Sequence, residues 1–217
     1  MRQILLALLL LLAPTCALAQ ETAPAALDPE AAVVRAAPPA PAAREWKMVE
    51  KESSITFKGK QMGKDFDGEI RSFTPAIYFD DAQLDQSKVT VDIDLTTIDA
   101  RDTDRNKSLF GADWLDIPQF PKARFETQKI TKKDDGSYVA EATLTLHGTV
   151  QQIELPFTLA IDTKDSGKDT AVMNGKVTLD RSKFSLGTGD WADPSVIAND
   201  IEVEVKLTAT ADKAGTK

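Results

Sequence analysis

The sequence predicts an all-β domain whose antiparallel sheet of about eight strands closes into a barrel. Apolar and polar residues alternate along most of the chain after Trp46, which is the pattern of strands with one dry and one wet face. Short turn sequences separate these runs, as expected for antiparallel neighbours. Such a sheet buries its apolar face as a barrel or as a sandwich. The long strands favour the barrel, which can enclose one small ligand.

The clearest predicted strand spans 89–95, where valine, isoleucine and leucine alternate with threonine and aspartate. The same alternation runs over 153–161 and 201–207. Pro156 predicts an edge or a bulge in the first of these, because proline cannot donate a ladder hydrogen bond. Five weaker candidates are 55–57, 70–79 with an interruption near Pro75, 125–130, 138–146 and 173–179. Turns are predicted at Asp67-Gly68, Asp135-Gly136, His147-Gly148 and Ser166-Gly167.

The first 19 residues predict a cleaved secretion signal. One early cation precedes an apolar run over 4–13, and Ala17-Leu18-Ala19 forms a small-x-small cleavage site. The run is shorter than the roughly 20 residues that span a bilayer, although a retained anchor is an alternative. We therefore expect a periplasmic protein that begins at Gln20 and has lost Cys16, so no disulfide can form within it.

Composition divides the remaining chain into three parts. Residues 20–45 are rich in alanine and proline and predict a disordered tether. Residues 46–211 hold the strand patterns and form one domain, and 212–217 form a flexible tail. The formal net charge of −8 argues against nucleic acid as a partner, because phosphates require basic patches.

The sequence contains no recognisable catalytic motif. G-x-S-x-G, H-E-x-x-H and a phosphate loop are absent, and the single histidine, His147, stands at a predicted turn. Asp113 and Asp116 flank Trp114 like a pair of glycosidase acids, but a chain with 34 acidic residues contains such pairs by chance. We expect no catalytic residues, no cofactor and no enzymatic activity.

A calcium loop is the alternative for residues 102–113. Asp102, Asp104 and Asn106 have the spacing of the first three ligands, and Asp113 stands where the last would be. The glycine required for the sharp turn is replaced by Lys107. A helix whose N-terminus is capped by an acidic side chain explains the same residues without metal, and we expect the cap.

The order of several motifs resembles the YceI-like family of secreted polyisoprenoid-binding proteins. They include S-I-T-F-K-G, F-D-G-E-I-R-S-F, V-D-I-D-L-T-T-I-D and L-D-R-S-K-F-S-L-G-T-G-D-W, and the resemblance covers 46–211. The most specific stretch is R-N-K-S-L-F-G-A-D-W-L-D-I-P-Q-F-P-K-A-R-F at 105–125. Its residues in the family's order are Arg105, Leu109, Asp113, Trp114, Phe120, Pro121 and Phe125. The family often has a histidine where this chain has Ser108, so no head-group role is carried over to that position.

This resemblance implies a lipocalin-like, eight-stranded antiparallel barrel with a short helix near one mouth. Its apolar pocket would hold an isoprenoid lipid, either an isoprenoid quinone or a polyprenyl phosphate. The segment 187–191 is similar to a branch found near electron-transfer proteins, which favours the quinone. The residues expected to line the pocket are Phe57, Phe66, Phe73, Phe79, Ile93, Leu95, Phe125, Leu144, Phe157 and Leu159.

The stretch 105–125 would then close one mouth of the barrel. We expect a helix from Arg105 to about Leu115, ended by Pro118 and Pro121. Arg105, Leu109 and Trp114 would form the mouth and lid, with the last two turned inward. Arg105 would contact the lipid head group or, alternatively, pair with Asp102 or Asp113.

Two other functions stay open at this point. The barrel could be filled by its own side chains and act as an interaction or stress-associated module, or it could be a secreted hydrolase. The sequence also leaves open a homodimer and a transient contact with a membrane or a membrane electron-transfer protein.

Overall fold

The computed structural model describes residues 43–164 and 167–213. The predicted secretion signal, nearly all of the predicted tether and most of the predicted tail lie outside these residues. Within them, no helix is long and apolar enough to cross a membrane.

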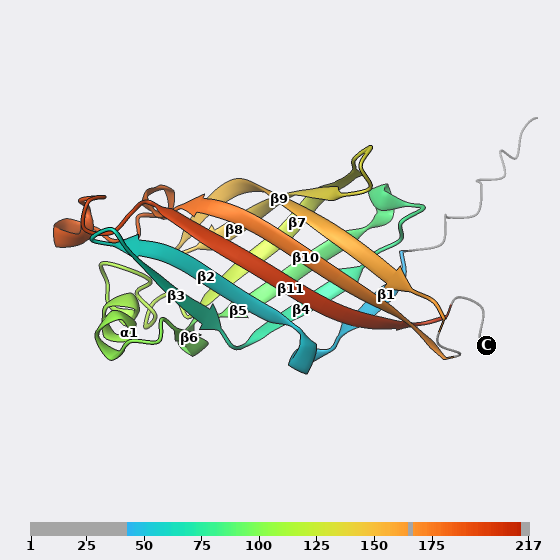
Figure 1. Ribbon diagram of the computed structural model, residues 1–217, viewed down its shortest axis with the longest axis horizontal. Coiled ribbons are helices and arrows are strands. Elements are labelled where there is room, and N and C mark those ends of the chain that lie inside the picture. The colour runs from blue at the N-terminus through green and yellow to red at the C-terminus, as the bar shows by residue number, and fades with distance from the viewer. Residues whose placement is uncertain (1–42, 165–166, 214–217) are drawn as a thin grey trace, which may run out of the picture. The chain divides into compact units, whose positions relative to one another are not determined.

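In the described residues, eleven antiparallel strands form one sheet that closes into a barrel (Figure 1). The ring contains eight of them, β1, β4, β5, β7, β8, β9, β10 and β11, and it closes because β1 pairs with both β4 and β11. β2, β3 and β6 extend the sheet from β11. The strands are β1 Glu45–Met48, β2 Ser54–Gln61, β3 Lys64–Ile70, β4 Phe73–Tyr78, β5 Lys88–Asp94, β6 Ile98–Asp99, β7 Lys122–Lys132, β8 Tyr138–Leu146, β9 Thr149–Asp162, β10 Lys168–Asp180 and β11 Asp200–Asp212. The predicted all-β barrel is confirmed.

Short helices lie at the ends of the strands. The one α-helix of the described residues is α1, Thr103–Phe110, and Figure 1 shows it and β1 at opposite ends of the barrel. The 3-10 helices are η1 Glu50–Glu52, η2 Leu84–Gln86, η3 Leu95–Thr97, η4 Arg181–Phe184 and η5 Gly189–Trp191.

Aromatic side chains fill the end of the barrel where β1 closes the ring. Tyr138 stacks on Phe157 with ring centroids 5.1 Å apart, and Phe79 meets Tyr138 edge-on at 6.1 Å. Trp46 from β1 is 4 % exposed, and its indole N–H donates to the Phe79 oxygen at 3.1 Å. Burial of these large rings is the main stabilising term at this end.

One predicted turn and the predicted position of one strand break were wrong in the first half of the domain. Asp67-Gly68 lies inside β3, and the hairpin between β2 and β3 turns at Met62-Gly63, where both residues have positive φ. A glycine is required at this position of the strand because a Cβ there would collide with the Phe57 ring. The predicted strand 70–79 divides at 71–72 rather than at Pro75, which lies within β4 opposite Val91.

Pro156 lies on a strand edge, as predicted, although β9 is flanked by two strands. The ladder between β9 and β8 covers residues 149–157 of β9, whereas its ladder with β10 covers only 157–162. In the β9–β10 ladder, the residue pair nearest to Pro156 is Phe157 with Gly175. Residues 149–156 therefore have an edge that is not paired with β10.

The folded domain is longer than predicted at both ends. Ala43 is 6 % exposed, and Arg44 donates from Nη1 to Asp169 Oδ2 at 2.7 Å. Glu45 begins β1, and β11 continues to Asp212. Residues 43–45 resemble the tether in composition, but hydrogen bonds of Arg44 with Phe79 and Asp169 join them to the barrel.

Candidate functional site

A cavity of about 240 Å³ lies inside the barrel. Thirty described residues line it, and Arg181 is the one charged residue among them. Alternation along the strands explains this lining, because every second side chain of each strand points inward. Seven residues predicted to face a pocket line this cavity: Phe57, Phe66, Phe73, Ile93, Leu95, Phe125 and Leu144.

A second cavity, of about 80 Å³, lies toward the aromatic end of the barrel. The remaining three predicted residues, Phe79, Phe157 and Leu159, line it. The two cavities share five lining side chains: Val89, Phe125, Leu155, Met173 and Leu207. These side chains separate two parts of one apolar interior, and the contact of the ten predicted residues with a ligand stays a prediction.

The prediction of the lining omitted β10 and β11. Val177, Leu179, Val203 and Val205 face the main cavity, and the period-two pattern over 201–207 was visible in the sequence. The phase of an isolated strand does not say which face turns inward. Arg181 carried no such signal, because a single arginine after a strand ordinarily points to solvent.

The acidic cap predicted for this helix is present, but α1 begins at Thr103, two residues before the predicted start at Arg105, and it also ends earlier than predicted. Asp102 caps it, and its Oδ1 accepts from the main-chain nitrogens of Asp104 at 3.1 Å and Arg105 at 2.9 Å. The helix ends at Phe110 rather than near Leu115, because the chain turns at Gly111. The Gly111 carbonyl accepts from the main-chain nitrogens of Trp114 and Asp116. Pro118 and Pro121 therefore do not end this helix.

Leu109 and Trp114 both line the cavity, as expected for a lid, but Arg105 does not. Arg105 Nη1 donates to the Ala100 oxygen at 2.7 Å, and Nη2 lies 3.9 Å from Asp102 Oδ2. Its guanidinium carbon lies 5.1 Å from the centre of the Phe66 ring. These local partners account for Arg105 without a head group.

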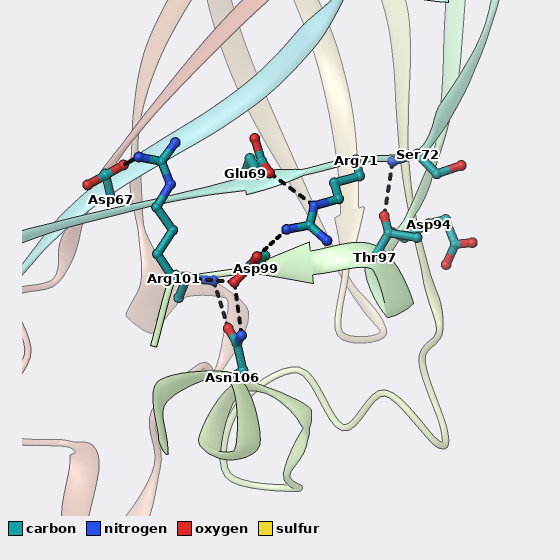
Figure 2. A network of polar contacts seen from close by, with 10 residues as sticks. Asp67, Glu69, Arg71, Ser72, Asp94, Thr97, Asp99, Arg101 and Asn106 are labelled. Atoms are coloured by element: carbon teal, nitrogen blue, oxygen red, sulfur yellow. Dashed lines mark hydrogen bonds and ion pairs between the residues drawn. The ribbon is translucent and has the colours of Figure 1, made fainter. Parts of the chain in front are cut away.

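A polar network joins α1 to β3 and β6 (Figure 2). Asp99 Oδ1 accepts from Asn106 Nδ2 at 2.9 Å and from the Arg101 nitrogen at 2.8 Å, while Asp99 Oδ2 pairs with Arg71. Arg101 Nη1 reaches Asp67 Oδ2 on β3 at 2.6 Å. The hydrogen bond from Asn106 is the main cause that lowers the pKa of Asp99, followed by the bond from Arg101. The network holds the lid against the barrel.

Two of the four residues of the calcium alternative, Asp102 and Asn106, have hydrogen-bond partners within this lid. Asp102 caps the helix, and Asn106 bonds to Asp99 and to the Ala100 nitrogen. Within residues 43–164 and 167–213, no three His, Cys, Asp or Glu side chains are grouped so that they could hold a metal ion.

A model of the YceI-like domain matches residues 46–209. This chain belongs to the YceI-like family. Curated relatives include a UPF0312 protein of Vibrio campbellii, 28% identical over 150 residues that cover 65% of this chain and 77% of the relative. A UPF0312 protein of Pseudomonas putida strain W619 is 32% identical over 144 residues, covering 65% and 70%.

Solved structures share this YceI-like fold. BcnA of Burkholderia cenocepacia aligns with a TM-score of 0.69 and 26% identity, covering 75% of this chain and 99% of BcnA. The YceI protein of Campylobacter jejuni aligns with a TM-score of 0.60 and 21% identity, covering 68% and 84%. A polyisoprenoid-binding domain from Saccharophagus degradans aligns with a TM-score of 0.55 and 14% identity, covering 78% and 99%.

In this YceI-like barrel, two loops meet beside Arg181 at the lid end of the cavity. Asp113 accepts through its main-chain oxygen from the nitrogens of Gly187 at 2.7 Å and Thr188 at 3.0 Å. Gly187 has a φ of +71°, and a Cβ there would collide with Arg181 and with the Trp114 ring. The Gly187-Thr188-Gly189 segment thus allows close packing of the two loops.

Arg181 is 2 % exposed, and neutral oxygens surround its guanidinium. Burial lowers the pKa of Arg181 from its ordinary value, although a guanidinium keeps its charge in proteins. Its N–H groups donate to five main-chain oxygens, those of Leu186 at 2.7 Å, Gly187 at 3.0 Å, Trp191 at 2.9 Å, Ile197 at 2.8 Å and Ala198 at 3.2 Å.

The single histidine has a structural position at the same end. His147 Nδ1 lies 3.2 Å from the Phe184 oxygen, and its ring meets Phe120 edge-on with centroids 5.0 Å apart. These contacts pack the turn between β8 and β9 against η4.

Proposed function

We propose that this protein binds the hydrocarbon chain of an isoprenoid lipid inside its barrel and carries or stores it without catalysis. The main support is the cavity of about 240 Å³, because only one of its thirty lining residues is charged. An apolar space of this kind is hydrated poorly and favours hydrocarbon. The unfilled volume speaks against a barrel filled by its own side chains.

The size of the cavity suits part of a lipid chain. An engineered apolar cavity of roughly 150 Å³ stays dry and binds benzene, and this one is larger. Each buried methylene-sized group contributes about 0.8 kcal/mol, so ten groups contribute roughly 8 kcal/mol before the cost of immobilising the chain and the protein. Displacement of the five shared side chains would add the second cavity to the space.

The family comparison supports the same class of ligand. The Saccharophagus degradans neighbour is a polyisoprenoid-binding domain, and at 14% identity it shares the fold of this chain. The apolar lining of the cavity in this chain independently favours a hydrocarbon ligand.

We also propose that the protein works in the periplasm after export. The motivation is the apolar run over 4–13 followed by Ala17-Leu18-Ala19. An intact mass that starts at Gln20, for protein recovered from the periplasmic fraction, would support this location. Retention of 1–19, or a diacylglycerol on Cys16, would refute it.

The lipid proposal is tested by native mass spectrometry of protein purified gently from its host, followed by lipid extraction. Val177 faces the cavity, and its neighbour Thr178 is exposed on the outer face of β10. Val177→Lys should remove the co-purified lipid by placing a charge in the cavity, and Val177→Trp should remove it by filling space. Thr178→Lys is the matched control and should retain it.

The result that overturns the proposal is equally definite. Wild-type protein that carries no isoprenoid and also refuses added isoprenoid quinones and polyprenyl phosphates would exclude lipid carriage. Retention of lipid in a folded Val177→Trp variant would place the ligand outside this cavity.

A further inference from the structure

The closed interior of the barrel is too small for a long isoprenoid chain. An apolar cavity of roughly 150 Å³ holds one benzene ring, and the two cavities of this barrel measure about 240 Å³ and about 80 Å³. At that scale they hold a chain of roughly a dozen carbons. A longer chain therefore requires part of the barrel wall to move.

The wall is weakly paired at β1, which closes the aromatic end. β1 pairs with β4 through Glu45 and Trp46, and with β11 through Lys47 and Met48. β10 and β11, by contrast, pair along their whole length. Opening of β1 breaks few ladder bonds, and α1 at the opposite end of the barrel does not have to move (Figure 1).

A pivot separates β1 from the strand that follows it. The 3-10 helix η1 interrupts the extended chain between β1 and β2. On either side of η1 the chain is bonded to Thr208 of β11, which is 2 % exposed. The Val49 nitrogen donates to the Thr208 oxygen at 2.8 Å, and the Thr208 nitrogen donates to Ser53 Oγ at 3.1 Å. These bonds fix the chain at η1, so β1 can move about this point while β2 stays paired with β11.

An ion pair fastens the chain just before β1 to β10. Arg44 Nη1 donates to Asp169 Oδ2 at 2.7 Å, and the guanidinium carbon lies 4.3 Å from the centre of the Trp46 ring. Asp169 is 7 % exposed, and its Oδ1 is buried without a hydrogen-bond partner among the described residues. A buried carboxylate oxygen without a donor costs free energy, and water can donate to it once the ion pair opens. This cost in the closed state makes opening easier.

Trp46 is the side chain that β1 places in the interior. It is 4 % exposed and lines the second cavity together with Phe79 and Phe157. A hydrocarbon chain can take the place of the indole ring and keep the neighbouring apolar side chains away from water, so the chain offsets the lost packing. The hydrogen bond from the indole N–H to the Phe79 oxygen is lost on opening, and water can satisfy both groups at the open end.

We propose that residues 43–48 form a flap that opens about η1 and lets the far end of a long lipid chain extend past the place of Trp46. The closed flap limits the interior to short chains. Arg44 and Trp46 therefore determine the chain length that the barrel accepts. This inference rests on the proposed lipid binding and adds the length of the ligand to it.

A disulfide that locks the flap tests this proposal. Lys47 of β1 is opposite Thr210 of β11, and the Cα atoms of such partners lie within the range of a disulfide. Cys16 is the only cysteine of the sequence, so a Cys16→Ser background leaves Lys47→Cys and Thr210→Cys as the only pair. The matched control lock is Asn174→Cys with Lys206→Cys, which are opposite each other on β10 and β11.

The probes are isoprenoid alcohols, which dithiothreitol does not reduce, with chains of about ten and about forty carbons, of which only the shorter fits the closed cavities. In a displacement assay, the oxidised flap lock should lower the affinity for the long chain, relative to the short one, by about tenfold, because about two methylene-sized groups or more stay outside. Dithiothreitol should restore the wild-type ratio in the same molecules. The control lock should leave the ratio unchanged in both redox states.

Hydrogen exchange in the wild type gives a readout that needs no disulfide. A long-chain isoprenoid quinone should make the amides of 45–48 exchange faster than in the free protein, because the chain holds the flap open. A short-chain quinone should leave these amides as slow as they are in the free protein. The amides of β2 are the internal reference and should stay protected with both quinones.

The outcomes separate this inference from the lipid proposal. If the short chain binds and the oxidised flap lock keeps the wild-type ratio, the flap is refuted while lipid binding stands. An equal loss in the control lock, or unchanged or slower exchange of 45–48 with the long chain, also refutes the flap. If the wild type binds neither chain length, as alcohol or as quinone, lipid binding itself fails and the flap fails with it.

Discussion

Asn106 on α1 donates from Nδ2 to Asp99 Oδ1 at 2.9 Å, and its own Oδ1 accepts from the main-chain nitrogen of Ala100 at 2.7 Å. One amide side chain thus bonds to two consecutive residues at the end of β6. Ala100 is fully buried, so water cannot replace the bond to its nitrogen. Asn106 therefore connects the lid helix α1 to the end of β6.

Asn106→Ala should loosen the lid and lower the stability of the domain. The buried Ala100 N–H would lose its acceptor, which costs about 1–3 kcal/mol. A calorimetric melt should show a fall in Tm of about 2–4 °C per kcal/mol. Lys107→Ala, at the exposed neighbouring position of α1, is the control. Equal Tm values for Asn106→Ala and Lys107→Ala would contradict a role for Asn106 in holding the lid.

Gly68→Ala should destabilise the barrel and reduce the cavity. A Cβ at this position would meet the Phe57 ring and the Asp99 carbonyl, so the ring must move into the space that it now lines. Overpacking of this kind should lower the free energy of unfolding, measured by urea titration, by about 1–3 kcal/mol. The control is Gly167→Ala, where a Cβ meets nothing within 4 Å and the change should stay within about 0.5 kcal/mol.

Met173→Ala should join the two cavities. Met173 lines both, and its removal should cost about 2–5 kcal/mol of stability while lengthening the apolar space. The variant should bind a long isoprenoid chain better, relative to a short one, than the wild type does in a displacement assay. Met62→Ala, at a side chain that is 72 % exposed, should change neither property. An unchanged chain-length preference in Met173→Ala would show that the cavities act separately.

Acid should destabilise the aromatic end of the barrel through Asp81. Hydrogen bonds from Lys132 and from the Tyr138 hydroxyl lower the pKa of Asp81 below its ordinary value of 3.8. Because the folded-state pKa is the lower one, this contribution is present above the unfolded pKa and is lost as pH falls through the folded pKa. The loss therefore begins near the ordinary value and continues below it.

Tyr138→Phe removes one of the two bonds that lower the pKa of Asp81. Urea unfolding at about pH 7 and about pH 3 should therefore show a smaller loss of stability on acidification than in the wild type. Tyr78→Phe is the control, because Tyr78 is 45 % exposed. A pH difference as large in Tyr138→Phe as in the wild type would exclude a contribution of the Tyr138 hydroxyl to the pKa of Asp81.

The sequence was sufficient to predict the barrel because its strands repeat with period two over long runs. The alternation in β5, β9 and β11 has one interpretation, and all ten predicted pocket residues lie along one cavity or the other. An acidic helix cap was predictable from local sequence, because the capping side chain accepts from main-chain nitrogens two and three residues ahead, although the predicted helix start at Arg105 was two residues late.

Features that depend on contacts distant in sequence could not be predicted. Gly68 resembles a turn glycine, and only the approach of Phe57 from the neighbouring strand explains why β3 has a glycine at this position. Ala43 and Arg44 resemble the alanine-rich segment before them, but Arg44 pairs with Asp169, 125 residues away. The hydrogen bonds from the Gly187 and Thr188 nitrogens to the Asp113 oxygen likewise join two loops that share no local pattern.

The ladder between β9 and β10 stops at Phe157 and Gly175. Beyond this pair the barrel wall has a seam, a stretch in which the two neighbouring strands share no ladder hydrogen bonds. Along 149–156, β9 can separate from β10 without breaking a ladder hydrogen bond between them. The bonds from Gln151 to the Lys183 oxygen and from His147 to the Phe184 oxygen close the far end of this stretch. Local opening should therefore need little free energy here, and amides on this edge should exchange faster than amides in the part of β9 that is paired on both sides. A long flexible lipid could pass sideways through such a seam while the lid at the mouth stays shut.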